Sequence, residues 1–260
     1  MQFYKYHGAG NDFIMVDQRS SQIDLTDQAL IARLCHRRFG IGADGLIALQ
    51  DSTEADFAML YFNADGRPGS MCGNGGRCIV AFAAHLGMVD GGCTFVAYDG
   101  LHRATWLPPN QVRLQMSPVH DIAKIGEDYY LDTGSPHYIR YTDDLSQIDV
   151  AREGRAIRHD ARFGQAGTNV NFVSRQKDGH LQVLTYERGV EAETYACGTG
   201  VVAAAIAAHH SWRSDSRAST TRVITRGGTL SVELQHNERG EYHDIYLTGP
   251  VERVFQGVWA

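Results

Sequence analysis

Two short stretches, MCGNGGRC at residues 71–78 and ACGTG at residues 196–200, repeat one pattern in which a cysteine precedes spaced glycines. Each runs into a long apolar segment, CIVAFAAHLGM after the first and VVAAAIAA after the second. A helix that is apolar on every face is buried all round. The two cysteines lie 197 − 72 = 125 positions apart, close to half of the 260 residues. We therefore expect each half of the chain to wrap strands around one central buried helix.

The rest of the chain fits two domains, since domains most often have about 100–150 residues. Short alternating segments such as QVRLQM and LQVLTYE predict half-buried strands, and helices are predicted at 26–38, 77–88, 144–155 and 200–212. The expected fold class is α+β, with two pseudo-symmetric domains of mixed strands around a central helix. We place the boundary in LQMSPVHD, so that residues 1–116 form the first domain, with 249–260 returning to it, and 117–248 form the second.

Composition excludes several classes of function. The net charge is −6 and no basic run occurs, which argues against a nucleic-acid partner. No apolar run reaches the roughly 18 residues of a membrane span, and the start MQFYKYHGAGNDF lacks the apolar core of a secretory signal. A cytoplasmic protein that binds neither nucleic acid nor membrane is expected. The absence of CxxC and HxxxH spacings argues against a metal site.

The two cysteine corners suit a reaction at a carbon next to a carboxylate. The first amides of a helix are unpaired donors that favour negative charge, so a cysteine there tends to be a thiolate with a lowered pKa. Glycines allow those amides to approach a bound anion. If Cys72 and Cys197 faced each other across a cleft, one thiolate would remove a proton from one face of the carbon and the other thiol would return one. A disulfide between them remains open, although a cytoplasmic setting favours thiols.

The three remaining cysteines, Cys35, Cys78 and Cys93, are interpreted as small core residues, since an isolated cysteine most often packs as one.

The motifs resemble those of the diaminopimelate epimerase family. They are KYHGAGNDFIMVD near the start, RRFGIGADGLI at 37–47, YFNADG and MCGNGGRC at 61–78, GTNVNFV at 167–173, and YERG with ETYACGTG at 186–200. The resemblance implies epimerisation of L,L- to meso-diaminopimelate, in lysine and peptidoglycan-precursor biosynthesis, without pyridoxal phosphate or metal. It also implies that Cys72 and Cys197 are the two acid and base residues. A homodimer is expected from the frequency of such assemblies.

The family's binding residues carry over by position. The resemblance assigns the substrate's distal amino and carboxyl groups to Asn11, Asn63, Asn169, Glu187 and Arg188. It assigns the carboxylate at the reacting carbon to the backbone amides of Gly73, Asn74, Gly198 and Thr199. Arginine can form two parallel hydrogen bonds to a carboxylate, and glutamate can bind an ammonium, which agrees with these assignments.

The sequence departs from the family at two places. Ser135-Pro136-His137 stands where the family commonly has Asn-Pro-His, so Ser135 is interpreted as a substrate contact through a hydroxyl or a bridging water. The segment GVEAETYA between Arg188 and Cys197 is one residue longer than usual, and we expect it to bulge. Both changes bear on substrate preference rather than on the class of reaction.

Three other functions compete with this one. A proline racemase-like enzyme would also use two thiols, but Arg188 and the asparagines suit a second charged end and Asn74 stands where such racemases usually have histidine. An isomerase of the phenazine-biosynthesis type would lack the paired cysteines. A non-catalytic amino-acid binder would be indifferent to loss of either thiol.

Overall fold

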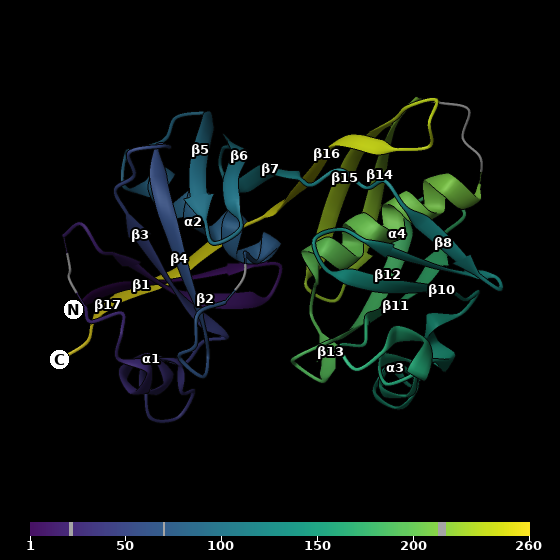
Figure 1. Cartoon of the computed structure of the whole chain (residues 1–260). Helices are drawn as coiled ribbons and strands as arrows, with labels where there is room; N and C mark the ends of the chain where they lie inside the picture. The colour runs from purple at the N-terminus through teal and green to yellow at the C-terminus, as the bar shows by residue number, and fades with distance from the viewer. Residues whose placement is uncertain (21–22, 70, 213–216) are drawn as a thin grey trace. The chain divides into compact units, whose positions relative to one another are not determined.

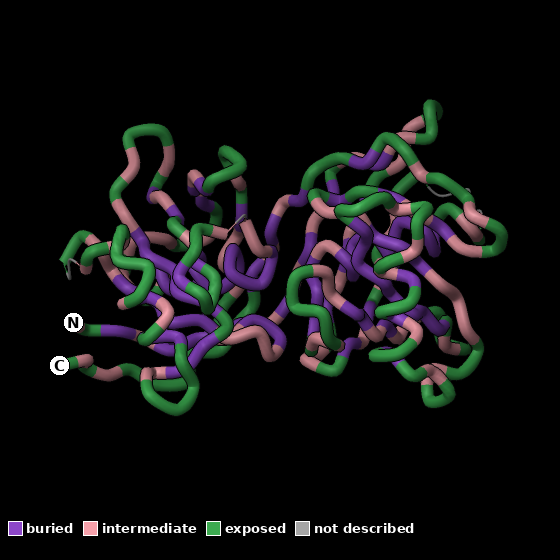
Figure 2. The backbone as a smooth tube through the Cα atoms, turned by 60° about the horizontal axis from the view of Figure 1, so that its bottom comes forward, coloured by how far each residue is buried: buried purple, intermediate pink, exposed green. Residues whose placement is uncertain are grey.

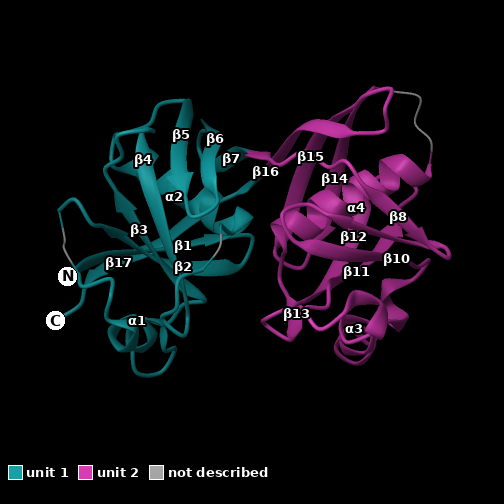
Figure 3. Cartoon of the chain, viewed as in Figure 1, with its two compact units in different colours: residues 1–114, 249–260 teal, residues 115–248 magenta. Residues whose placement is uncertain are grey.

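The computed structural model describes residues 1–20, 23–69, 71–212 and 217–260. The chain divides into two compact units, shown in different colours in Figure 3. Unit 1 contains Met1–Leu114 and Gly249–Ala260, and unit 2 contains Gln115–Thr248. Each unit buries a core of apolar residues, and many of its turns are exposed (Figure 2).

Unit 1 consists of strands around one central helix, with a second helix outside them (Figure 1). Its central helix is α2 (Gly73–His85), and the outer one is α1 (Gln28–Cys35). Its strands are β1 (Gln2–Gly8), β2 (Asn11–Asp17), β3 (Gly45–Gln50), β4 (Phe57–Asn63), β5 (Gly92–Ala97), β6 (Gly100–Leu107), β7 (Gln111–Met116) and β17 (Glu252–Val258).

Unit 2 has the same composition of elements. Its central helix is α4 (Gly198–Ser211), and α3 (Val150–Arg158) lies outside the strands (Figure 1). Two 3₁₀ turns, η1 (Leu145–Gln147) and η2 (Ala161–Phe163), flank α3. The strands are β8 (Ile122–Ile125), β9 (Asp128–Asp132), β10 (Pro136–Tyr141), β11 (Asn169–Arg175), β12 (Leu181–Glu187), β13 (Ala192–Thr194), β14 (Ala218–Thr225), β15 (Gly228–His236) and β16 (Tyr242–Pro250).

The strand pairing repeats between the units. In unit 1 the groups β17-β1-β2, β3-β4 and β5-β6-β7 are antiparallel within themselves, and the pairs β2–β3 and β4–β5 are parallel. In unit 2 the groups β8-β9-β10, β11-β12 and β14-β15-β16 are antiparallel, and β10–β11 and β12–β14 are parallel. Strand β17 therefore occupies in unit 1 the place that β8 occupies in unit 2.

Both central helices are buried as their apolar sequences predicted. In α2 every residue from Gly73 to Ala83 is buried, and in α4 the same holds from Gly200 to His209. Helix α2 packs against β1, β2, β3, β4 and β6, and α4 packs against β9, β10, β11, β12, β14 and β15. Burial on all sides supplies most of the stabilisation of such a helix, because the packed apolar surface is removed from water.

The prediction that α2 begins at 77 was wrong. The helix begins at Gly73, so the glycines of CGNGG form its first turn instead of a separate turn before it. Their backbones are not left-handed, since none of them has a positive φ. Glycine disfavours a helix by about 1 kcal/mol relative to alanine, which is why the sequence pattern pointed to a later start.

The other helix predictions were close to the structure. The structure has helices at Gln28–Cys35, Val150–Arg158 and Gly198–Ser211 where 26–38, 144–155 and 200–212 were predicted. Within the described part of the chain, none of the helices is both long enough and apolar enough to cross a membrane.

Candidate active site

Cys72 stands directly before α2, at the N-cap position. Its backbone is extended, with φ −108° and ψ 124°, and its side chain does not cap the helix with a hydrogen bond. Its carbonyl accepts the first helical bond, from the Gly76 amide at 2.7 Å. The sulfur is therefore held at the end of a helix where amides without helical partners favour negative charge.

Two asparagines lie beside the Cys72 sulfur. Sγ of Cys72 is 3.6 Å from Oδ1 of Asn11, and Nδ2 of Asn74 donates to the same Oδ1 at 3.2 Å. Oδ1 of Asn74 in turn accepts a hydrogen bond of 2.8 Å from the Arg77 guanidinium, which also donates to the carbonyl of Gly73 at 3.2 Å. Arg77 is fully buried, and burial lowers its pKa.

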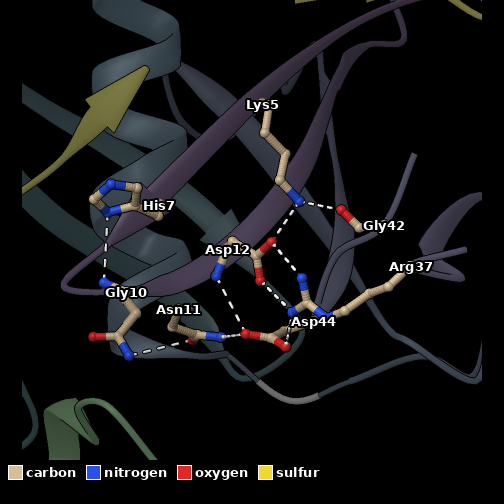
Figure 4. A network of polar contacts seen from close by, with 9 residues as sticks. Lys5, His7, Gly10, Asn11, Asp12, Arg37, Gly42 and Asp44 are labelled. Carbon is tan, nitrogen blue, oxygen red and sulfur yellow. Dashed lines mark hydrogen bonds and ion pairs between the residues drawn. The ribbon is translucent and has the colours of Figure 1, made fainter. Parts of the chain in front are cut away.

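A cluster of charged side chains lies on the other side of Asn11 (Figure 4). Nδ2 of Asn11 donates to Oδ2 of Asp44 at 2.8 Å. Arg37 bonds both Asp44, at 2.6 Å, and Asp12, at 3.0 and 2.7 Å. Lys5 reaches Asp12 at 2.6 Å and donates to the Gly42 carbonyl.

The charge state of Asp12 follows from this cluster. Burial opposes its ionisation, but hydrogen bonds from Arg37 and Lys5 outweigh burial and hold the pKa of Asp12 well below its usual range. Asp44 and Arg77 were not predicted as site residues. A charge in the otherwise apolar helix sequence GNGGRCIVAF was the one signal that pointed to Arg77.

The last residue of unit 1 that the sequence predicted, Asn63, ends β4. It is exposed and pairs with Gly45 in the strand register, and its backbone amide and side-chain Nδ2 lie 2.9 and 3.5 Å from the Arg67 carbonyl. Cys72, Gly73, Asn74 and Asn11 are thus brought together in unit 1, while Asn63 bonds the turn that follows β4.

Cys197 occupies the equivalent position in unit 2. It is the N-cap of α4, with φ −110° and ψ 112°, it makes no side-chain cap bond, and its residue is 8 % exposed. Its sulfur lies 3.4 Å from Oγ1 of Thr199. The Thr199 carbonyl accepts from the Thr133 hydroxyl at 2.9 Å, which fixes the first turn of the helix.

A buried histidine supports Thr199. Nε2 of His137 is 2.9 Å from Oγ1 of Thr199, and its Nδ1 is 3.0 Å from Nδ2 of Asn171. Oδ1 of Asn171 accepts from the Thr185 hydroxyl at 2.9 Å. Because the Asn171 amide is then the donor to Nδ1, the ring is neutral with its hydrogen on Nε2.

The protonation state of His137 agrees with this assignment. Burial, together with the positive charge of Arg188, lowers the pKa of His137 to about 3. Nε2–H then donates to the Thr199 oxygen, which lies 3.4 Å from the Cys197 sulfur.

The unit 2 residues predicted for the distal end of the substrate form a second group, whereas Asn11 and Asn63 lie in unit 1. Nδ2 of Asn169 donates to the Ser135 hydroxyl at 2.8 Å and to the Pro136 carbonyl at 3.0 Å. Oδ1 of Asn169 accepts from the Arg188 amide at 2.8 Å. Asn169 therefore joins Ser135 to the end of β12, where Glu187 and Arg188 lie next to one another.

The longer segment after Arg188 folds into a turn that the sequence did not specify. The Glu191 amide donates to the Glu187 carbonyl at 2.8 Å, and Glu191 has a left-handed backbone with φ 58°. Its carboxylate accepts from the Gly189 amide at 3.0 Å and from Arg158 of α3 at 3.1 Å. Strand β13 then pairs back onto β12.

The other three cysteines are buried free thiols. Burial raises the pKa of Cys35 and of Cys93 to about 12, and it raises that of Cys78 as well. Such thiols are neutral and unreactive near neutral pH, as expected of core residues.

Known proteins resemble this chain along its whole length. The sequence profile described as diaminopimelate epimerase matches residues 3–121 and 129–254. A protein of Flavobacterium psychrophilum named diaminopimelate epimerase is 47 % identical over 98 % of this chain and 99 % of its own length. One of the same name from Chlorobaculum tepidum is 45 % identical over 96 % of this chain and 98 % of its own length.

Two solved structures share the fold at low sequence identity. A Bacillus anthracis phenazine biosynthesis protein of the PhzF family has a TM-score of 0.79 at 14 % identity and covers 100 % of this chain and 99 % of that one. A probable proline racemase from Agrobacterium radiobacter has a TM-score of 0.70 at 19 % identity and covers 100 % of this chain and 92 % of that one. These likenesses and the repeated strand pairing confirm the predicted fold of two similar α+β domains.

Proposed function

This chain belongs to the diaminopimelate epimerase family, as its motifs predicted, and from that membership we propose how its residues carry out the reaction. It is an isomerase of lysine biosynthesis that epimerises diaminopimelate. The proposed reaction converts the L,L isomer to the meso isomer at one α-carbon, with Cys72 and Cys197 as the acid and base.

In the proposed mechanism the two thiols act on opposite faces of the α-carbon. The thiolate of one cysteine takes the α-proton and becomes a thiol, while the electron pair of the broken C–H bond spreads onto the carboxylate. The thiol of the other cysteine gives its proton to the opposite face of the carbon and becomes the thiolate. Charge and protons balance, and the enzyme is left with the two roles exchanged.

One observation carries this proposal. Each cysteine is the N-cap of the central buried helix of its unit. Both sulfurs therefore lie beside helix amides suited to a carboxylate. We assign that carboxylate to the amides of Gly73 and Asn74 in unit 1, and of Gly198 and Thr199 in unit 2.

The experiment that tests the mechanism follows the α-proton in D₂O. Reduced protein with L,L-diaminopimelate should exchange the α-proton for deuterium and form the meso isomer, as seen by proton NMR. Cys72→Ala and Cys197→Ala should each abolish epimerisation and leave thermal unfolding close to that of the wild type. Turnover retained in either variant would contradict the two-thiol scheme. Exchange with proline but not with diaminopimelate would point to the racemase alternative.

We further propose that the group around Asn169 binds the distal end of the substrate. Arg188 would hold the distal carboxylate and Glu187 the distal ammonium, with Ser135, Asn63 and Asn169 completing the hydrogen bonds. Asn11 would bind from beside Cys72, since its amide lies against that sulfur. Arg188→Ala should raise KM far more than it lowers kcat, because the contact is made in both ground state and transition state.

A homodimer and a cytoplasmic location belong to the same proposal. Strand β17 exposes three apolar side chains, Val254 at 51 %, Phe255 at 47 % and Val258 at 78 %. Exposed apolar groups of this kind suit an interface between copies. Light scattering of the wild type should give twice the mass of one chain, and Phe255→Glu should give the mass of a single chain. A wild-type protein with the mass of a single chain would contradict the dimer. The cytoplasm suits a reaction that needs two reduced thiols.

A further inference from the structure

We propose that Asp44 and Arg77 are positioning residues that hold the two ends of a chain of asparagine amides and so turn the carbonyl oxygen of Asn11 toward Cys72. The chain runs from Arg77 through Asn74 and Asn11 to Asp44. This inference rests on the proposed function, because it assigns the surroundings of a thiol that the mechanism uses.

The direction of every bond in this chain follows from its two ends. A guanidinium can only donate hydrogen bonds and a carboxylate can only accept them. Arg77 therefore requires Oδ1 of Asn74 at 2.8 Å, which leaves Nδ2 of Asn74 to donate to Asn11 at 3.2 Å. Asp44 requires Nδ2 of Asn11 at 2.8 Å, which leaves Oδ1 of Asn11 for Asn74. Arg77 and Asp44 therefore favour the same arrangement, in which the side-chain amide of Asn74 donates to that of Asn11.

Each end is itself held firmly. The Asp44 amide donates to the Asp12 carbonyl at 2.9 Å, its carboxylate accepts from the Asp12 amide at 3.3 Å, and Arg37 bonds the same carboxylate (Figure 4). Arg77 is 0 % exposed, and its two terminal nitrogens donate to Asn74 and Gly73, while its Nε has no hydrogen-bond partner among the described residues. A buried cation is costly unless its donors are satisfied, so Arg77 has a strong preference for the Asn74 oxygen.

The close packing around this chain restricts its alternatives. A Cβ added at Gly8, at the end of β1, would lie 2.9 Å from the Asn74 carbonyl oxygen and 3.4 Å from the Arg77 guanidinium. The glycine thus lets β1 approach the first turn of α2 closely. Little space remains there for Asn74 or Arg77 to adopt another arrangement.

The chemical consequence lies at the Cys72 sulfur. Oδ1 of Asn11, 3.6 Å away, is an acceptor for the S–H group and favours the protonated thiol. It is also the atom that would accept from a substrate ammonium. An inverted Asn11 amide would present a donor to the sulfur, favour the thiolate, and repel the ammonium. Arg77 and the buried Cys78 are titratable groups that also interact electrostatically with Cys72.

The test compares Asp44→Ala with Asp44→Asn and with a matched control, Arg37→Gln. The control removes the ion pairs that Arg37 makes with Asp12 and Asp44 but retains the carboxylate that accepts from Asn11. Alkylation of Cys72 by iodoacetamide is measured from about pH 5 to about pH 10 by mass spectrometry of the Cys72 peptide, which separates it from the other four thiols. Initial rates of α-proton exchange give kcat and KM for the same variants.

We expect Asp44→Ala to move the midpoint of Cys72 alkylation to lower pH by about half to one unit and to lower kcat/KM about tenfold. Asp44→Asn should fall between Ala and wild type, since its amide oxygen can still accept. Arg37→Gln should leave the midpoint in place. In an Asn11→Ala background, Asp44→Ala should cause no further change in the midpoint, because Asp44 acts through Asn11.

Two results would overturn the inference. One is an unchanged midpoint in Asp44→Ala, and the other is a shift of the same size in Arg37→Gln or in the Asn11→Ala background. If Asp44→Ala does not fold, Arg77→Lys tests the Arg77 end of the chain of amides. Lysine retains the positive charge but lacks the planar guanidinium that donates to both Asn74 and Gly73. Alkylation is read without substrate, so this outcome is separate from the Cys72→Ala and Cys197→Ala tests of the proposed function.

Discussion

Replacing Gly200 with alanine would place a methyl group against the side chain that supports the Cys197 group. An ideal Cβ at Gly200 lies 2.4 Å from Oδ1 of Asn171 and 3.2 Å from Cε1 of His137. Real Cβ contacts essentially never fall under 3.0 Å, so Asn171 or the helix must move by at least 3.0 − 2.4 = 0.6 Å. Asn171 is bound at its oxygen by Thr185 and at its nitrogen by His137, so the movement disturbs both bonds.

Gly75 is the matched control, because it stands at the same place in the first cysteine motif, three residues after Cys72. Its added Cβ would meet Cδ1 of Ile47 at 2.9 Å and Cε of Met59 at 3.3 Å. Both are terminal atoms of flexible side chains that can rotate away. The same substitution therefore meets a fixed amide in one unit and a yielding apolar contact in the other.

The magnitude follows from these contacts. Alanine in place of a helical glycine adds up to about 1 kcal/mol of helix stability at either position. At position 200 overpacking costs about 1–3 kcal/mol, and one disturbed buried hydrogen bond costs about 1 kcal/mol more. Gly200→Ala should thus lower the free energy of unfolding by about 2 kcal/mol, whereas Gly75→Ala should leave it unchanged or slightly higher.

Calorimetry and the exchange assay together check this prediction. A loss of about 2 kcal/mol corresponds to a fall in Tm of about 4–8 °C for a protein of this size. Because the displaced Asn171 supports His137 and through it Thr199, Gly200→Ala should also lower kcat. Equal Tm and equal kcat in Gly200→Ala and Gly75→Ala would refute the reasoning.

Three further predictions concern His137, Asp12 and Glu191. His137 has a pKa below that of an unfolded histidine, so its burial as a neutral ring should make stability fall by about 1.4 kcal/mol per pH unit as pH drops from about 6.5 toward 3; His137→Gln should remove that slope in urea titrations. Asp12→Asn should destabilise by about 3 kcal/mol, measured by urea unfolding, since it leaves Lys5 buried without its carboxylate. Glu191→Gln should raise KM a few fold with kcat little changed, since it weakens the bond from Arg158 that holds the turn after β12.

The sequence predicted the features that depend on local pattern. The uniform apolarity of VVAAAIAA sufficed to place a buried helix, and the repeated cysteine corner sufficed to select Cys72 and Cys197. The start of α2 was misplaced because local propensity disfavours glycine, while the packed helix needs small residues near Ile47 and Met59.

The features that the sequence did not reveal depend on contacts between distant residues. Asp44 joins Asn11 across 33 positions, and Glu191 joins Arg158 across 33 as well. No periodicity or motif spacing encodes such a pair, because the strands that bring them together are set by the whole fold. Ser135 is an intermediate case: its change from the family's asparagine was visible, but its bond to Asn169 was not.

The return of β17 to unit 1 also has a consequence for biosynthesis. Strand β1 pairs along its length with residues 252–258, and the Met1 amino group and carbonyl both bond Trp259. The ribosome synthesises residues 1–114 before residues 252–259 exist. The edge of β1 that pairs with β17 therefore stays open while unit 2 is synthesised. Unit 2, whose corresponding strand β8 is local, can complete its sheet first. The order of maturation should therefore run opposite to the order of translation.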